Sequence, residues 1–441
     1  MAGSAGAVIA APSSGSGKTT ITLGLLRHFA RTNVPVSSFK IGPDYIDPGF
    51  HTAAGGRYCL NLDGWAMRDE TLNALYAQVA AYSEIVLGEG VMGLFDGARG
   101  QTGDRDGSTA DIARRLGLPV ILVVDAGAQA QSAAATVHGF STYREDTNLA
   151  GVIFNLIGST RHADMLKDAM ASSGIPVLGC IPRTADVSIP DRHLGLVQAS
   201  EMAALEIFLD RAADLVARHI DLPLLRQVLA PSNARRSGPH PQPIPPIGHH
   251  IAVAADEAFQ FCYRHVIDGW RAADAEVLLF SPLSDQAPSA DADAVYLPGG
   301  YPELHADLLS ANQGFLSGLR DAAARGATVY GECGGYMVLG DALVDADGQR
   351  HLMTGLLPVE TSFADRKLHL GYRDATLAAD TPLGTTGDIF GAHEFHYARI
   401  VSQEIADPLF RVSDAAGTDL GPMGLRRNNV MGSFIHLIDR R

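Results

Sequence analysis

The sequence predicts an α/β protein of two domains, and three observations support this fold class. The chain has 441 residues, which exceeds the length at which a single hydrophobic core usually stops growing. Short apolar runs alternate with helix-like stretches along most of the chain, a rhythm typical of parallel sheets covered on both faces. A proline-rich stretch divides the chain near its middle.

The dividing stretch runs from Pro231 to His250 and contains six prolines together with Ser, Asn, Gly and His. This composition favours extended, solvated backbone over packed structure. We therefore expect an N-terminal domain over residues 1–230, a linker over 231–249 and a C-terminal domain over 250–441. Both domains are of ordinary size.

The first domain is predicted to contain six strands, at Val8–Ala11, Val34–Lys40, Ile85–Glu89, Val120–Asp125, Val152–Ile157 and Val177–Ile181. Helical patterns fall between them at Thr19–Arg31, Thr71–Ala81 and Thr109–Leu116. Strands separated by crossover helices in this way imply a mostly parallel sheet.

The second domain repeats the alternation, with strands predicted at Ile251–Ala255, Val277–Phe280, Ala294–Leu297 and Thr328–Glu332. A glycine-rich tail follows, and its pattern favours antiparallel strands. A second α/β domain is the expectation.

Charge and composition narrow the classes of function. The chain is 46% hydrophobic with a net charge of −15, which gives no general attraction to nucleic acid or acidic lipid. No run of eighteen uninterrupted apolar residues is available to span a bilayer. We expect neither a nucleic-acid partner nor a membrane protein.

Cysteine usage and the N-terminus indicate a compartment. The four cysteines are scattered without CxxC pairs, which argues against a disulfide framework or a thiolate zinc site. The first residues lack the basic start of a signal peptide. A reducing cytoplasm is the expected location.

A glycine-rich loop lies between the first predicted strand and helix, and consists of Gly15, Ser16, Gly17, Lys18, Thr19 and Thr20. Free backbone N–H groups and the helix dipole favour phosphate at such a turn. Lys18 is expected to reach the β- and γ-phosphates of ATP, and the Thr19 hydroxyl to bind Mg²⁺. The strict nucleotide-loop pattern fails at its first glycine, which here is Pro12.

Two further segments follow predicted strand ends, where ligands usually bind. In Phe39–His51, Lys40 is expected to hold a substrate carboxylate or the γ-phosphate, and Asp44 and Asp47 to bind Mg²⁺ or orient the acceptor. The alternative is a Pro/Gly turn with solvated charges. Glu89 is expected to be a second Mg²⁺-ordering carboxylate, and we rank it above Asp125, since an aspartate there is more often a helix cap.

A second constellation lies in the C-terminal domain. Cys333 stands between small residues just after a strand, as a nucleophile does at a strand-to-helix elbow, where the helix N-terminus would stabilise its thiolate. Gly299 and Gly300 end an earlier strand and offer N–H groups to an oxyanion, and His436 offers a general base. Each alone has a common structural explanation, but their order predicts a glutaminase with Cys333 and His436 as catalytic residues.

At these residues the chain resembles the cobyrinic acid a,c-diamide synthase family, which includes the hydrogenobyrinic acid enzymes. The resemblance spans nearly the whole chain and is carried by Ser13–Thr20, Phe39–His51, Glu89–Gly97, Arg192–Leu196, Tyr330–Tyr336 and Gly391–Tyr397. It implies a P-loop domain like that of dethiobiotin synthetase, joined to a class I glutamine amidotransferase-like domain. The implied substrates are ATP, L-glutamine and a corrinoid acid.

The resemblance also implies the chemistry. ATP would phosphorylate the c and then the a acetate carboxylate, and ammonia from glutamine would displace phosphate from each acyl phosphate. Lys18, Thr19 and Glu89 would handle MgATP. His193, on the Arg192–Leu196 motif, would join Lys40, Asp44 and Asp47 on the substrate side.

This sequence departs from ordinary class I glutaminases, which place a glutamate two residues after the catalytic histidine. Ile438 occupies that position here. His436 either forms a dyad with Cys333 or is oriented by another group; Glu394 is one candidate, and Asp439 is nearer in sequence but off register. The run His393–Tyr397 resembles a two-histidine, one-glutamate metal site, but its spacing is not that of HExxH. We favour a domain-interface or glutamine-site role for it.

Two alternative functions remain open on sequence alone. One is a related glutamine-dependent synthetase acting on another tetrapyrrole, of the cobyric acid or nickel sirohydrochlorin type. The other is a partition-type regulatory ATPase with an inactive C-terminal domain, which an intact Cys333 and His436 argue against. The sequence also leaves a homodimer open.

Overall fold

The structure is a computed structural model, and it describes residues 4–98, 106–184, 187, 199, 202, 204–231 and 241–441. The chain divides into two compact units. The described residues of unit 1 lie within 4–64, 72–98 and 106–231, and those of unit 2 within 65–71 and 241–441. The domain limits 1–230 and 250–441, with a linker between them, stay a prediction.

Unit 1 is built on a sheet with the strand order β3-β2-β4-β1-β5-β6-β7, in which all neighbours are parallel. The strands are β1 (Ala5–Ala10), β2 (Val36–Ile41), β3 (Leu60–Leu62), β4 (Ile85–Glu89), β5 (Val120–Asp125), β6 (Leu149–Ile157) and β7 (Val177–Pro182), and β8 (Ala230–Pro231) pairs antiparallel with β1. The predicted parallel sheet is confirmed. Strand β3 was not predicted, because it is only three residues long.

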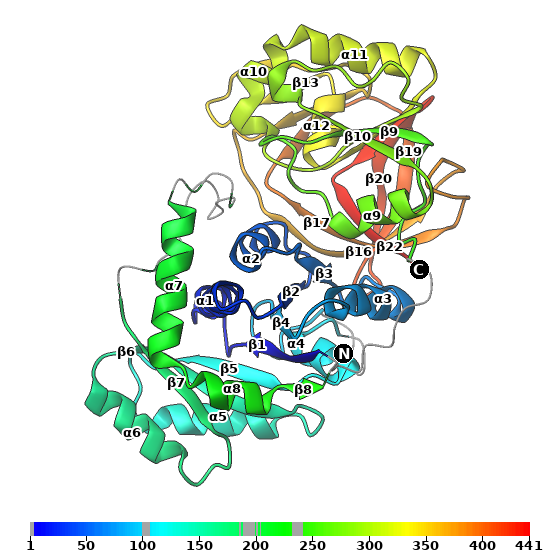
Figure 1. Cartoon of the computed structure of the whole chain (residues 1–441). Coiled ribbons are helices and arrows are strands. Elements are labelled where there is room, and N and C mark those ends of the chain that lie inside the picture. Colours follow the sequence, from blue (N-terminus) through cyan, green and yellow to red (C-terminus); the bar gives the residue numbers. More distant parts are fainter. Residues whose placement is uncertain are drawn as a thin grey trace. The chain divides into compact units, whose positions relative to one another are not determined.

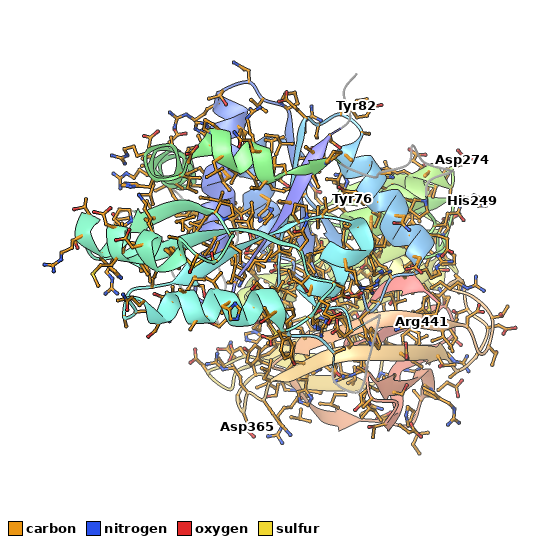
Figure 2. The ribbon with its side chains drawn as sticks, turned by 90° about the horizontal axis from the view of Figure 1, so that it is seen from below. Tyr76, Tyr82, His249, Asp274, Asp365 and Arg441 are labelled. Carbon is orange, nitrogen blue, oxygen red and sulfur yellow. The ribbon has the colours of Figure 1, made fainter. Side chains whose placement is uncertain are left out.

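The helices of the first part of the chain are α1 (Lys18–Arg31), α2 (Asp47–Gly55), α3 (Asp69–Ala80), α4 (Thr109–Leu116), α5 (Ser132–Thr142), α6 (Thr160–Met170), α7 (Leu205–His219) and α8 (Leu222–Val228). Helices α1 and α7 pack against each other over one face of the sheet (Figure 1), and Arg27 of α1 bonds Asp210 of α7 at 2.7 Å. On α3, Tyr76 is buried with its ring edge against Phe39 of β2, whereas Tyr82 beyond the helix is 78% exposed (Figure 2).

The strand order of unit 1 determines where its polar loops meet. Strand β4 lies between β1 and β2, with Ile9 and Lys40 both in register with Glu89. Carboxyl ends of parallel strands share one edge of a sheet, so the loops after β1, β2 and β4 converge there. Helix α2 was not predicted: residues 44–51 were interpreted as a loop, but a helix begins at Asp47 with Pro48 in its first turn, a position that proline favours.

Unit 2 is built on a sheet with the order β10-β9-β11-β12-β21-β20-β19-β16-β17-β22, parallel from β10 to β21 and antiparallel beyond. Its strands are β9 (His250–Ala254), β10 (Glu276–Phe280), β11 (Ala294–Leu297), β12 (Thr328–Glu332), β16 (His369–Leu377), β17 (Ile389–His396), β19 (Asp407–Asp414), β20 (Asp419–Arg427), β21 (Val430–Ser433) and β22 (Ile435–Arg440). The four predicted strands and the antiparallel tail are confirmed.

A smaller sheet of unit 2 has the order β14-β13-β15-β18 and consists of β13 (Ala342–Val344), β14 (Arg350–Leu352), β15 (Val359–Ser362) and β18 (Arg399–Gln403). The helices of this unit are α9 (Arg264–Ala272), α10 (Ala306–Ala311), α11 (Gln313–Ala324) and α12 (Gly334–Leu339), with short 3₁₀ turns η3 (Pro282–Ser284) and η4 (Pro302–His305). Phe315 of α11 and Met337 of α12 share one core with Val295 of β11.

Residues 241–247 are packed, which differs from the solvated backbone expected of the proline-rich stretch. Ile244 and Ile247 are buried, and Trp270 Nε1 donates to the carbonyl of Pro245 at 3.1 Å. The isoleucines between the prolines supply apolar surface that is removed from water. Among the described residues, every helix is too short or too polar to cross a membrane.

Candidate active site

The phosphate loop of unit 1 has the backbone that only glycine adopts easily. Gly15 and Gly17 have φ of +80° and +94°, in the region that disfavours a side chain. A Cβ on Gly17 would also lie 2.2 Å from Asn155 Nδ2, which donates to the carbonyl of Ser16 at 3.0 Å. The sequence analysis did not identify Asn155, which approaches the loop from β6.

Lys18 begins α1 and is held across the loop. Its Nζ donates to the carbonyl of Met92 at 2.8 Å, and Met92 has a φ of +49°, a conformation that is strained for a residue with a side chain. Burial lowers the pKa of Lys18, although the charge of Glu89 opposes the shift. Thr20 lies half-buried in the first turn of the same helix.

Glu89 is fully buried and lies at the centre of a cluster of site residues predicted from the sequence. Thr19 Oγ1 donates to Glu89 Oε1 at 2.6 Å, and Lys40 Nζ donates to the same oxygen at 3.0 Å. Lys40 also forms an ion pair with Asp47 and lies 3.7 Å from Asp44. Burial disfavours the charge on Lys40, but Asp47 and Glu89 outweigh it and raise its pKa.

His51 is a member of this cluster to which the sequence analysis assigned no role. Its Nε2 lies 2.7 Å from Glu89 Oε2, and its Nδ1 lies 3.6 Å from Cys59 Sγ. Burial disfavours its protonation, but Cys59 and Glu89 outweigh burial and raise the pKa of His51 to about 10. Asp47 and His51 are four residues apart on α2, so they share a face of the helix. That signal was present in the sequence once the helix start was recognised.

These residues could hold Mg²⁺ and a nucleotide. The hydroxyl of Thr19 and the carboxylate of Glu89 are oxygen donors, which Mg²⁺ prefers, and they lie beside a loop shaped for phosphate. The structure thus brings together Thr19, Glu89, Lys40 and Asp47. Asp125 is exposed and accepts from the N–H of Gly127 in a turn. His193 lies outside the described residues.

In unit 2 the predicted elbow at Cys333 is confirmed. The residue links β12 to α12 with a φ of +48°. Its backbone N–H donates to the carbonyl of Ser433 at 2.8 Å, and its Sγ lies 3.7 Å from the carbonyl of Phe395. A Cβ on Gly335 would lie 2.0 Å from the carbonyl of Leu297, so the tight turn needs glycine there.

His436 and Gly299 lie at this elbow. A Cβ built on Gly299 would lie 2.4 Å from His436 Cε1 and 3.3 Å from Cys333 Cβ. His436 belongs to β22, where it is fully buried and opposite His393 of β17. The fold thus places the predicted glycine, nucleophile and base at one point.

The expected stabilisation of the Cys333 thiolate is not what the structure gives. Cys333 is buried, and burial together with the charge of Glu303 raises the pKa of its thiol. Loss of solvation exceeds what the start of the six-residue helix α12 supplies. The resting thiol is therefore protonated at neutral pH, and a nucleophilic role for Cys333 would require a base that accepts its proton.

Four positions bear on the acid that would orient His436. Ile438 is apolar and buried. Asp439 forms an ion pair with Arg68, whose Nη2 lies 2.8 Å from Asp439 Oδ1. Glu394 is bonded by Arg373 at 2.7 Å and by His396 at 2.9 Å. Glu332, which precedes Cys333, has its Oε2 3.7 Å from His436 Nδ1. Glu332 is not among the residues predicted from the sequence.

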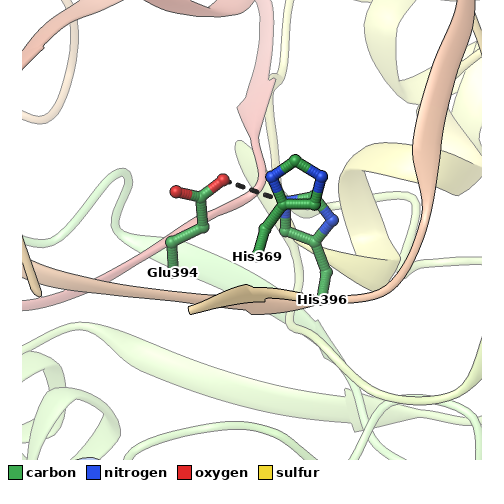
Figure 3. Close-up of side chains that lie close together, drawn as sticks. All are labelled: His369, Glu394 and His396. Carbon is green, nitrogen blue, oxygen red and sulfur yellow. Dashed lines mark hydrogen bonds and ion pairs between the residues drawn. The ribbon is translucent and has the colours of Figure 1, made fainter. Parts of the chain in front are cut away.

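His369, Glu394 and His396 offer ligand atoms within 4.8 Å of one another (Figure 3). The two imidazole rings are stacked, with planes 4° apart and centroids separated by 4.7 Å. Lone pairs of stacked rings lie in parallel planes and do not converge on one cation. Burial alone would raise the pKa of Glu394, but bonding to His396 and the charge of Arg373 lower it to about 2. The geometry is that of an ion-pair cluster and does not fit a bound metal ion.

Comparison with known proteins identifies both parts of the chain. Residues 7–197 match the CobQ/CobB/MinD/ParA nucleotide binding domain, and residues 250–441 match the CobB/CobQ-like glutamine amidotransferase domain. A protein of Brucella abortus named hydrogenobyrinate a,c-diamide synthase is 54% identical over 98% of both chains. The chain belongs to this synthase family.

Two further relatives with the same name also match over nearly the whole length of both chains. The Rhizobium meliloti protein is 53% identical, covering 98% of this chain and 99% of its own, and the Rhodobacter capsulatus protein is 52% identical over 99% of both. Membership favours the diamide synthase interpretation over a cobyric acid-type synthetase or a partition-type ATPase. It also agrees with the expected enzyme class, a glutamine-dependent synthase with a nucleotide-binding domain.

Proposed function

We propose that the chain converts the a and c acetate carboxylates of hydrogenobyrinic acid, or of its cobalt-containing counterpart, to amides with ATP and glutamine in cobalamin biosynthesis. The observation that carries the proposal is the elbow at Cys333, where a Cβ on Gly299 would meet both Cys333 and His436, in a chain that also contains the Thr19–Glu89 site. Relatives that share more than half of its residues over nearly the whole chain are named for this reaction.

Unit 1 would activate the carboxylate. A carboxylate oxygen bonds to the γ-phosphorus of ATP while the bond from that phosphorus to the bridging oxygen breaks, which leaves an acyl phosphate and ADP. Lys18 would contact the β- and γ-phosphates, and Thr19 and Glu89 would hold Mg²⁺, which would supply positive charge to the phosphate oxygens. Lys40, Asp44, Asp47 and His193 are assigned to the substrate side.

Amide formation follows at the same carbon. Ammonia attacks the carbonyl carbon of the acyl phosphate, the bond from that carbon to the phosphate oxygen breaks, and inorganic phosphate and a proton leave. Phosphate is a far better leaving group than the oxide that the free carboxylate would have to expel. The synthetase reaction therefore needs ammonia but is indifferent to its origin.

Unit 2 would supply that ammonia. The Cys333 thiol transfers its proton to His436 as Sγ attacks the carboxamide carbon of glutamine, and backbone N–H groups after β11 face the oxyanion. His436 then protonates the leaving nitrogen, the carbon–nitrogen bond of the tetrahedral intermediate breaks, and ammonia departs, leaving a thioester on Cys333. Water hydrolyses the thioester to glutamate and regenerates the thiol.

The location and assembly of the protein are part of the proposal. A reducing cytoplasm would suit the four cysteines, which are all free thiols. A homodimer is a further proposal, which light scattering on the purified chain would check.

The substrate is tested directly by incubating the chain with MgATP, glutamine and a panel of tetrapyrrole acids, followed by mass spectrometry. Two added amides on hydrogenobyrinic or cobyrinic acid are expected. Amidation of a different tetrapyrrole, with none of the a,c-diamide, would contradict the substrate.

The division of labour is tested with Cys333→Ala. This variant should lose amidation with glutamine and retain it with a high concentration of ammonia, since only ammonia supply depends on the thiol. Loss of both activities in a folded variant would refute the two-site scheme.

A further inference from the structure

Glu332 stands directly before the nucleophile and is a charged residue inside the protein. It is 4% exposed, at the end of β12. An ionised carboxylate is costly to bury unless each oxygen finds donors. The hydrogen-bond donors around Glu332 therefore show which acceptor position of its carboxylate is still unoccupied.

Three hydrogen-bond donors occupy most of the acceptor positions of this carboxylate. Tyr330 Oη donates to Oε1 at 2.8 Å, and the backbone N–H of Leu437 donates to Oε1 at 3.2 Å. Tyr296 Oη donates to Oε2 at 2.8 Å. Burial and the charge of Glu332 raise the pKa of both tyrosines, so their hydroxyls stay protonated and remain donors.

The remaining lone pair lies on the oxygen that faces His436. A carboxylate accepts at about four positions, two on each oxygen, and Oε2 is the oxygen 3.7 Å from His436 Nδ1. The bond from Leu437, the next residue along β22, fixes the carboxylate to the strand that presents the histidine. Hydrogen bonds of a catalytic group are often long without substrate and shorten in the complex.

The geometry points to Glu332 as the carboxylate that orients His436, so that the triad of this glutaminase is Cys333, His436 and the residue immediately before the nucleophile. With its proton held on Nδ1 by Glu332, His436 presents Nε2, on the other side of Cε1, as the base for the Cys333 thiol. Two of the other acids nearby, Asp439 and Glu394, are each paired with an arginine. Glu332 is a positioning residue, since it acts through His436.

The inference rests on the proposed glutaminase function, and glutamine hydrolysis is the activity that tests it. Glu332→Gln in the full chain removes the charge but not the side-chain length. We expect kcat for glutamine hydrolysis to fall by about 10²- to 10⁴-fold, as when the acid of a hydrolase triad is replaced. The KM for glutamine should stay within about threefold, because Glu332 does not contact the substrate.

Two controls separate this role from a structural one. Ammonia-driven amidation by the same variant should equal that of the natural chain, which shows that the protein is folded. Glu360→Gln, on β15 and paired with Arg350, should leave glutamine hydrolysis unchanged. A Glu332→Gln variant with natural ammonia-driven activity and natural kcat for glutamine would overturn the inference.

A second variant covers the case in which Glu332→Gln does not fold. Glu332→Asp keeps a carboxylate but shortens the side chain by one methylene group, which moves the carboxylate away from His436 by about one carbon–carbon bond. The kcat for glutamine hydrolysis should therefore fall by about tenfold or more. Natural kcat in Glu332→Asp would overturn the inference. If the natural chain hydrolyses glutamine but amidates no corrinoid acid, the proposed substrate fails while the role of Glu332 stands.

Discussion

His51 Nε2 lies 2.7 Å from Glu89 Oε2, so a histidine of α2 fixes the orientation of a carboxylate at the end of β4. The other oxygen of Glu89 is then directed at Thr19 and Lys40. Groups behind a metal ligand in this way set its rotamer and its basicity. The proposed phosphate site of unit 1 would thus depend on a residue that acts through Glu89.

His51→Ala should lower ammonia-driven amidation by about 10- to 100-fold, because Glu89 loses the donor that holds it in place. His51→Gln should recover part of that loss, since its amide can donate to the same oxygen. Steady-state kinetics with ammonia and varied MgATP measure the effect without the glutaminase. His138→Ala, an exposed histidine of α5, serves as the control, and natural kinetics in His51→Ala would show that Glu89 needs no such support.

Lys18→Ala should eliminate amide formation from glutamine and from ammonia alike, since phosphoryl transfer precedes both. Removing the lysine takes away the cation that would meet the phosphates of ATP. Product counting by mass spectrometry is the measurement, with exposed Lys167→Ala as the control. Ammonia-driven amidation that survives in Lys18→Ala would defeat the assignment.

The sequence was informative where function follows a strand end. Glu89 is the last residue of β4 and Lys40 is the last but one of β2, and parallel neighbours bring such residues to one edge. It was less informative at residues 44–51, where the charged residues together with Pro48 and Gly49 predict a loop. Because residues 47–51 belong to α2, the i,i+4 pair Asp47 and His51 was not recognised, and one side of the Glu89 cluster was missed.

Glu332 was harder to predict for a different reason. Successive residues of a strand point to opposite faces, so a residue adjacent to the nucleophile is not expected to serve the same site. Glu332 shares its face with Tyr330, and its other partners, Tyr296 and His436, come from β11 and β22. Only the order of strands in the folded sheet brings these partners together. The one signal in the sequence was the position of this glutamate at the end of a predicted strand.

Gly299→Ala should abolish glutamine use and leave ammonia-driven amidation intact. Its new Cβ would lie 2.4 Å from His436 Cε1, inside van der Waals contact, so the imidazole must move away from Cys333. Glutamine hydrolysis and ammonia-driven amidation measured side by side give the result. Gly139→Ala is the matched control, because a Cβ there meets nothing within 4 Å. Natural glutamine hydrolysis in Gly299→Ala would mean that His436 is not held where the structure places it.

The acid sensitivity of unit 2 should trace in part to His393. Burial, the charge of His436 and the charge of Arg373 lower the pKa of His393 to about 3, against its ordinary value of 6.5. Between these values the unfolded chain binds a proton that the folded chain does not, so the free energy of unfolding falls as pH drops below 6.5 and continues to fall towards 3. One such group contributes a slope of up to about 1.4 kcal/mol per pH unit.

His393→Phe keeps a ring of similar size and removes the titration, so the free energy of unfolding should depend less steeply on pH between 6.5 and 3. Denaturant unfolding followed by tryptophan fluorescence reports on unit 2, because both tryptophans of the chain, Trp65 and Trp270, belong to it. His249→Gln, at an exposed position (Figure 2), should keep the natural slope, since its ring is solvated in both states. Equal slopes in His393→Phe and the natural chain would mean that His393 titrates alike in the folded and unfolded states, and that its burial beside His436 is not what makes unit 2 sensitive to acid.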